Sequence, residues 1–185
     1  MIRTIFLVGK PGSGKETQAR LIAEKTGFSI LSTGEKFREL REHRDALGEH
    51  VRREYDSGNL MPDWFADYLF EDAILNLPQA SGVIFEGSGR SLEQAKVVHT
   101  VCTWLQRPYV VFNLAISDDE AVRRMMGRGR ADSNTEEKIR TRLKAFADTT
   151  SPALEHYKAQ GVRIDIHGER SIEEIHTEIM QHLSA

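Results

Sequence analysis

The stretch GKPGSGKETQ, residues 9–18, has the glycine spacing and the lysine that suit phosphate binding. It follows the strand-like run TIFLV and precedes a helical pattern, which is the context that a phosphate-binding loop requires. Gly12 and Gly14 would let the backbone curl so that successive N–H groups point at phosphate oxygens. Lys15 would reach the β- and γ-phosphates. The pattern favours binding of a nucleoside triphosphate over an ordinary turn of similar composition.

Glu16 is unusual, because such loops commonly carry Ser or Thr after the lysine. A carboxylate in the first turn of a helix gains about 0.3–1 kcal/mol from the helix dipole. Facing a phosphate at about 5 Å it would lose about 3 kcal/mol at an effective dielectric near 20. We therefore expect Glu16 to point away from the phosphates, to solvent or to a nearby Arg or Lys. Contact with a magnesium-bound water is the rival hypothesis.

Arginines gather near the predicted loops, and guanidinium groups bind phosphates through two parallel hydrogen bonds. The set is Arg38, Arg90, Arg123, Arg124, Arg128, Arg130, Arg140 and Arg142. For Arg123 and Arg140 we favour solvated helix faces paired with Glu. Phosphoryl transfer needs cations around a spreading charge, which favours functional roles for Arg90, Arg128, Arg130 and Arg142.

Glu86 ends the strand-like run GVIFE and is the candidate for a magnesium site. A carboxylate at the end of a parallel strand can hold magnesium through water. A lone Glu there can also cap a neighbouring loop, so both interpretations stay open.

The elements that must position these residues alternate along the chain. Strand-length apolar runs occur at 4–8, 28–32, 82–86, 109–115 and 162–166, with amphipathic stretches at 15–26, 34–57 (two helices), 63–77, 92–104, 118–127, 135–160 and 172–183. Such alternation predicts an α/β fold whose parallel sheet is covered by helices on both faces. Ligands bind such sheets at the carboxyl ends of the strands. Capping-box spacing marks three helix starts, at Ser91, Ser117 and Ser171.

The composition limits the possible partners. The chain has 185 residues and a net charge of −3, which suits one domain and argues against nucleic-acid binding. Cys102 is the only cysteine, so no disulfide framework is expected. The sequence contains no apolar run of about 18 residues and no signal-peptide pattern at its start, so we expect a cytoplasmic protein without a membrane partner.

Six blocks in order along the chain resemble the adenylate kinases of the nucleoside monophosphate kinase family. They are GKPGSGKETQARLIAEKTGF, LSTGEKFREL, SGNLMPD, FEGSGRSLEQA, RRMMGRGRADSNTEEKIRTRL and SPALEHY. The resemblance implies a P-loop NTPase-type three-layer fold with a five-stranded parallel sheet. It also implies a single domain, 1–185, with a core of 1–31, 63–126 and 135–185. The monophosphate-binding insertion would span 32–62 and the short lid 127–134.

The resemblance implies roles for individual residues. Donor ATP would be held by Gly12, Ser13, Gly14, Lys15, Glu16, Thr17, Arg124, Arg128 and Arg170. Acceptor AMP would be bound by Thr33, Arg38, Leu60, Met61, Gly87, Arg90, Gln94, Arg130 and Arg142. The catalytic groups would be Lys15, Arg90, Arg128, Arg130 and Arg142. The implied reaction is the reversible, Mg²⁺-dependent transfer of the ATP γ-phosphoryl group to AMP, which gives two ADP.

Gln94 illustrates how the base would be chosen. An amide presents one donor and one acceptor, which suits the adenine edge. The same side chain could instead complete the capping box with Ser91, and the two roles compete.

The sequence also departs from the family pattern. Glu35 and Glu86 stand where Asp is usual, and Ser133 replaces a second Asp after Asp132. GSGR, residues 87–90, replaces GFPR, which predicts a more mobile loop because Gly frees the backbone and Pro restricts it. The short lid lacks cysteines, so no zinc is expected. A kinase for another nucleoside monophosphate and a catalytically weak nucleotide sensor are the alternatives. The family implies a monomer.

Overall fold

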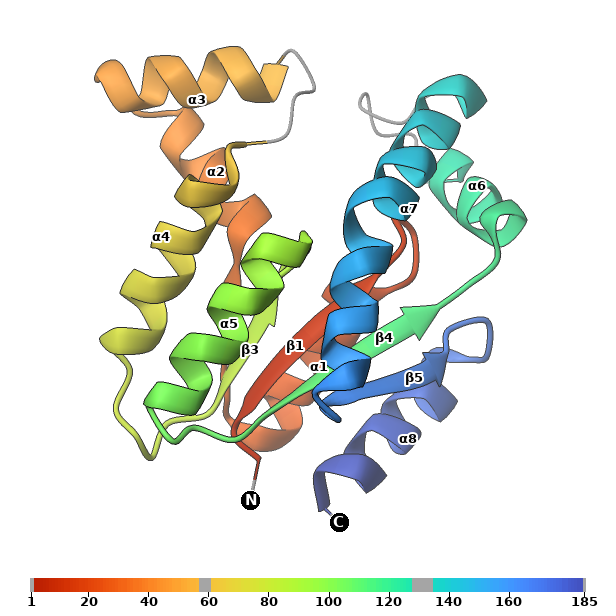
Figure 1. Cartoon of the computed structure of the whole chain (residues 1–185). Coiled ribbons are helices and arrows are strands. Elements are labelled where there is room, and N and C mark those ends of the chain that lie inside the picture. Colours follow the sequence, from red (N-terminus) through yellow and green to blue (C-terminus); the bar gives the residue numbers. More distant parts are fainter. Residues whose placement is uncertain (1, 57–60, 128–134, 185) are drawn as a thin grey trace.

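The computed structural model describes residues 2–56, 61–127 and 135–184 of the chain. Within them, five parallel strands form one sheet in the order β2-β3-β1-β4-β5 (Figure 1). The strands are β1 (Thr4–Gly9), β2 (Ser29–Ser32), β3 (Val83–Glu86), β4 (Tyr109–Ala115) and β5 (Arg163–His167). The predicted α/β class and the predicted five-stranded parallel sheet are therefore confirmed.

Helices connect the strands and cover both faces of the sheet (Figure 1). They are α1 (Lys15–Thr26), α2 (Thr33–Arg41), α3 (Ala46–Asp56), α4 (Asp63–Leu75), α5 (Leu92–Trp104), α6 (Asp118–Met126), α7 (Glu136–Ala159) and α8 (Ile172–Ser184). No predicted boundary differs from the observed one by more than two residues. None of the helices in the described part of the chain is long and apolar enough to cross a membrane.

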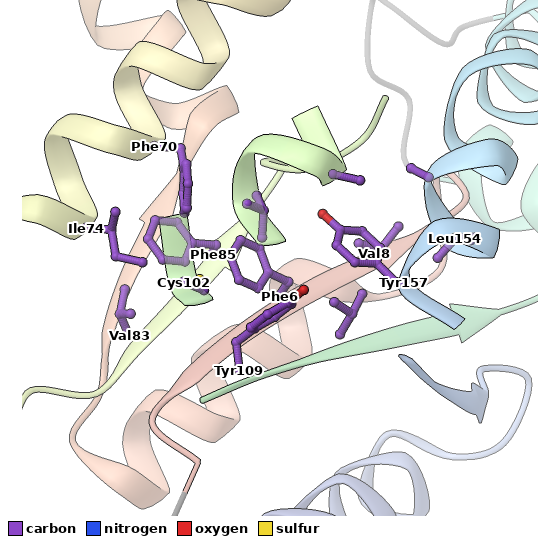
Figure 2. Close-up of a cluster of buried hydrophobic side chains, with 14 of the residues drawn as sticks. Phe6, Val8, Phe70, Ile74, Val83, Phe85, Cys102, Tyr109, Leu154 and Tyr157 are labelled. Carbon is purple, nitrogen blue, oxygen red and sulfur yellow. The ribbon is translucent and has the colours of Figure 1, made fainter. Parts of the chain in front are cut away.

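Alternation along β1 explains the three layers. Ile5 and Leu7 pack with α1 and α8 on one face, while Phe6 and Val8 pack with α4, α5 and α7 on the other. All four side chains are buried, which accounts for the continuous apolar run in the sequence. Figure 2 shows the second cluster, where Phe6 stacks on Phe85 with ring centroids 4.9 Å apart.

The strand order places the predicted functional loops at one edge. β1 lies between β3 and β4, and Leu7 of β1 is paired with Glu86 at the end of β3. The loop after β1 and the loop after β3 are therefore neighbours at the carboxyl ends of the strands. This is the edge at which open parallel sheets bind ligands.

The segment predicted as the monophosphate-binding insertion forms α2 and α3. A small separate cluster of Leu40, Val51 and Phe65 joins these helices to the start of α4. The domain boundaries 32–62 and 127–134 stay predictions. Lid residues 128–134 lie outside the described residues.

Candidate functional site

The loop between β1 and α1 has the conformation of a phosphate cradle. Gly12 and Gly14 have φ values of +84° and +94°, in the left-handed region that favours glycine. The Ser13 N–H donates to the Lys10 carbonyl over 3.1 Å, which closes the turn. Helix α1 begins directly afterwards at Lys15. The loop thus presents backbone N–H groups and a helix N-terminus at the same place, which suits an anion.

Lys15 lies folded onto this loop. Its Nζ donates to the carbonyl oxygens of Gly9 at 2.8 Å and of Lys10 at 3.0 Å. Thr17 is half-buried in the first turn of α1, and Ser13 is buried beneath the loop. The structure therefore brings together the predicted phosphate-binding residues 12–17.

Glu16 points as expected from its electrostatics. Its side chain is 61% exposed, and its carboxylate lies 3.8 Å from the guanidinium of Arg20 on the next turn of α1. An exposed pair of this length contributes little to stability. The predicted orientation of the carboxylate, toward a nearby Arg, is the one that the structure has.

Helix α6 packs directly against the phosphate loop. A Cβ added to Gly12 would lie 3.2 Å from Met125 and 3.3 Å from the Ala121 carbonyl, so a side chain there would crowd α6. Lys10 Nζ donates to the Ile116 carbonyl at 2.9 Å and lies 2.6 Å from the Asp118 carboxylate. These contacts fix the start of α6 beside the loop.

Arg124 extends from α6 and is held by Glu120. The Arg124 Nε lies 2.5 Å from the Glu120 carboxylate. Hydrogen bonds from Arg123, and then from Arg124, lower the pKa of Glu120 to about 2 against desolvation, which raises it. Arg124 is 24% exposed, so one part of it remains accessible beside the loop.

The end of β3 carries the second group of candidates. The Glu86 carboxylate accepts a hydrogen bond of 2.8 Å from Ser32 Oγ. Ser32 also caps α2, because it accepts from the Glu35 N–H. Gly87 follows with a φ of +94° and lies against Thr33. Glu86 thus contacts a neighbouring turn, one of its two predicted roles, and its metal-binding role stays a prediction.

Arg90 lies in the loop that follows β3, at the same edge of the sheet. Part of the side chain is exposed to solvent, while many protein atoms lie around the charged guanidinium group and partly desolvate it. This desolvation lowers the pKa of Arg90, while Glu86 raises it and Arg142 lowers it. Arg90, Glu86 and Arg142 therefore lie within electrostatic range of one another, as the sequence predicts for a phosphate site.

Gln94 lies in the first turn of α5 and is 7% exposed. Its Oε1 accepts from the Arg90 N–H at 2.8 Å, and its Nε2 donates to Asp63 at 2.8 Å. Its own N–H donates to Ser91 Oγ at 3.2 Å, so Ser91 caps the helix as predicted. The Gln94 side chain therefore accepts from the N–H of Arg90, and not from the N–H of Ser91 as a complete capping box would require. Contact with a base stays a prediction.

The remaining predicted contacts are spread around this edge. Arg38 lies on the exposed side of α2, and Met61 packs against the small cluster of Leu40, Val51 and Phe65. Arg170 pairs with Glu178 of α8. Leu60, Arg128 and Arg130 lie outside the described residues.

Arg123 and Arg140 behave as ordinary surface residues. Arg123 lies 2.6 Å from Glu120, and Arg140 lies 2.7 Å from Glu136 of its own helix. The preferred interpretation, a solvated helix face paired with Glu, is confirmed for both.

Sequence reasoning assigned no role to Lys10 and treated Ser88 only as a loosening substitution. Lys10 falls within the quoted loop, but its partner Asp118 is more than 100 residues away. Ser88 is 4% exposed and bonded to Thr33. Ser88 stands where the family pattern has an apolar residue, and this difference could have indicated a buried polar contact.

Comparison with known proteins shows the family to which this chain is similar. The sequence pattern of the family described as adenylate kinase matches residues 7–162. The adenylate kinase of Mycobacterium ulcerans is 37% identical over 180 residues, which cover 97% of this chain and 98% of that protein. The adenylate kinase of Mycobacterium tuberculosis is 39% identical over 168 residues, which cover 89% of this chain and 91% of that protein.

Proposed function

This chain belongs to the adenylate kinase family, and we infer that it transfers the γ-phosphoryl group of ATP to AMP in a reversible reaction that gives two ADP. It is a phosphotransferase, because the family and the named relatives are enzymes of that class.

One observation supports this reaction above all others. The phosphate loop after β1 and the 86–90 segment after β3 leave hydrogen-bonded neighbouring strands at the same edge. A donor phosphate on Lys15 would therefore lie beside an acceptor phosphate on Arg90. In-line transfer needs the two phosphates in this relation.

We propose that the reaction proceeds by alignment and charge stabilisation. Lys15 and the loop N–H groups hold the donor phosphates, while Arg90 and Arg38 hold the phosphate of AMP. Arg142 and the lid arginines Arg128 and Arg130 complete the cation ring. The AMP phosphate is already an anionic nucleophile, so no general base is required.

The base contacts form the second part of the proposal. Thr33, Gly87 and Gln94 border the acceptor side, with the backbone at Leu60 and Met61 closing over the base. Arg124 stacks on the donor adenine, and the backbone near Arg170 lies at its edge. These roles are transferred from the family pattern onto matching positions.

Magnesium fits a site with few protein ligands. Among the described residues, no group of three or more His, Cys, Asp or Glu side chains lies together as a metal cage would. Magnesium retains several waters and binds through one carboxylate and the substrate phosphates, which needs no such cage. Glu86 would hold it through water, with one carboxylate oxygen already occupied by Ser32. The bound ion would neutralise charge on the β- and γ-phosphates.

A coupled assay tests the proposal. ATP and magnesium are supplied with AMP, GMP, CMP or UMP, and ADP formation is followed. We expect turnover with AMP that Lys15→Met abolishes. Preference for UMP or CMP would instead indicate another monophosphate kinase. Binding of ATP and AMP without transfer would indicate a nucleotide sensor.

We also propose that the enzyme acts as a cytoplasmic monomer with ATP, AMP and ADP as its partners. The net charge of −3 supports the absence of a nucleic-acid partner.

A further inference from the structure

The loop of residues 87–90 is more firmly held than its sequence predicts. GSGR lacks the Phe and Pro of the family pattern, and the expected result is a mobile loop. Ser88 and Gly89 are nevertheless both buried. Burial of a hydroxyl is costly unless it is hydrogen-bonded, so the partner of Ser88 matters.

Ser88 bonds to Thr33, the first residue of α2 in the acceptor-binding segment. Its Oγ lies 2.9 Å from Thr33 Oγ1, and the two residues are 4% and 8% exposed. The preceding residue makes a parallel contact, since Ser32 Oγ donates to Glu86 at 2.8 Å. The hydroxyls of Ser32 and Thr33 at the start of α2 thus hold Glu86, the last residue of β3, and Ser88 in the loop that follows.

Tyr157 holds the other side of the same loop. Tyr157 is fully buried in the cluster of Figure 2, and its hydroxyl donates to the Gly89 carbonyl at 3.2 Å. A Cβ on Gly89 would lie 2.2 Å from this hydroxyl, and Gly89 has a φ of +69°. The glycine is therefore required by the tyrosine that packs against it. The loop is fixed to the core on one side and to α2 on the other.

We propose that Ser88 is a positioning residue that couples Thr33, in the acceptor-binding segment, to the loop that carries Arg90. Because Thr33 and Arg90 are the proposed contacts to the two ends of AMP, a shift of either one is transmitted through the buried hydrogen bond between Thr33 and Ser88. Ser88 and Tyr157 together replace the stiffness that Phe and Pro would give. This inference rests on the proposed function.

A double-mutant cycle on AMP binding tests the coupling. Calorimetry gives the Kd for AMP, and separate titrations give the KM for AMP and for ATP, for the full chain carrying Ser88→Ala, Thr33→Val or both. Ser88→Ala should weaken AMP binding roughly five-fold, the size of one hydrogen bond, and leave the KM for ATP unchanged. In the Thr33→Val background the same change should add nothing, because the bond is already absent.

Two further variants separate coupling from general loss of structure. Thr33→Ser keeps the hydroxyl, so Ser88→Ala should again weaken AMP binding in that background. Tyr157→Phe removes a hydroxyl bond to the same loop but not to Thr33, so its effect should be additive with Thr33→Val. If Ser88→Ala does not fold, Ser88→Cys keeps the size with a weaker donor, and the cycle is run with it.

The outcomes distinguish the two proposals. Additive effects of Ser88→Ala and Thr33→Val, or equal changes in the KM for AMP and for ATP, in a protein that turns over AMP would overturn the coupling alone. A wild type that binds no AMP would overturn the proposed function, and the coupling with it.

Discussion

At the scale of single residues, the orientation of the Glu16 side chain follows from its charge. It lies in the first turn of α1 with its carboxylate 3.8 Å from Arg20, which removes it from the phosphate side of the loop. Repulsion from a phosphate outweighs the gain from the helix dipole, so elementary electrostatics predicts this orientation.

We therefore predict that Glu16→Gly leaves the magnesium dependence of turnover unchanged. The matched variant is Glu86→Gln, which removes the proposed holder of magnesium waters and should raise the magnesium concentration needed for half-maximal rate. Magnesium titrations at fixed ATP measure both. A shift with Glu16→Gly and none with Glu86→Gln would reverse the two assignments.

Arg90 and Arg123 allow a comparison of two arginines in different surroundings. The guanidinium of Arg90 is partly desolvated and lies within electrostatic range of Glu86 and Arg142, whereas Arg123 is paired with Glu120 on an open helix face. Arg90→Lys keeps the charge but loses the fork that binds a phosphate bidentately, so we predict that kcat/KM falls about 100-fold or more. Arg123→Lys should change it by less than about two-fold. Steady-state rates with AMP varied decide between them, and similar losses would contradict the assignment.

The residue types and their loops could be predicted from the sequence, but their partners could not. The Gln94 side chain was correctly placed in the first turn of a helix, yet its bond to Asp63 joins residues 31 positions apart. Contacts of this kind depend on how α4 and α5 pack, and no local pattern encodes them.

The starts of helices can be predicted where a capping residue marks them in the sequence. Ser91, Ser117 and Ser171 each accept a hydrogen bond from the backbone N–H three residues later, as the capping pattern predicts. The returning side-chain bond forms only at Ser171, whose N–H donates to Glu174. Glu120 is drawn to Arg123 and Arg124 instead. Competing partners, both near in sequence and far from it, therefore decide whether the second hydrogen bond of a capping box forms.

Helix α6 packs against the phosphate loop and is followed in the chain by the predicted lid. Lys10 contacts the residues at the start of this helix. We predict that Lys10→Met raises the KM for ATP about 2–5-fold and leaves the KM for AMP unchanged. The reason is that loss of the bonds to Ile116 and Asp118 loosens the helix that carries Arg124. The KM for each nucleotide, measured with the other saturating, checks this.

Asp118→Asn separates this role from direct phosphate binding by Lys10. It removes the ion pair and leaves Lys10 with its bond to the Ile116 carbonyl, so a helix-holding role predicts a raised KM for ATP. A lowered KM for ATP would mean that the released lysine binds phosphate, and would contradict the prediction.

At the scale of the whole molecule, the sequence predicts the layers better than the strand order. Near-continuous apolar strands alternating with helices require burial on both sides, and β1 has that environment. That β3 lies between β2 and β1 depends on long-range pairing. No local pattern in the sequence predicts that order, although the order is what brings Glu86 beside the phosphate loop.

The stability of the whole molecule should depend on the half-buried Asp67 of α4. Burial, followed by the charges of Asp63 and Glu71, raises the pKa of Asp67 to about 6 from 3.8. A carboxyl whose pKa is raised on folding lowers the free energy of unfolding when it is ionised. This loss of stability is absent well below pH 4 and grows to its full size above about pH 6. Asp67→Asn should therefore increase the free energy of unfolding by about 1–2 kcal/mol at pH 8, below the full value of the shift because solvent screens this group.

Urea unfolding of wild type and variant across pH 4–8 measures this gain. The advantage of Asp67→Asn should shrink as pH falls through 6 and be small at 4, where the carboxyl is protonated in the folded state and only partly ionised in the unfolded state. Asp67→Glu keeps an ionisable group beside the charges of Asp63 and Glu71, and serves as the control that retains the pH dependence. An equal gain at pH 4 and pH 8 would mean that packing, and not ionisation, distinguishes the variant.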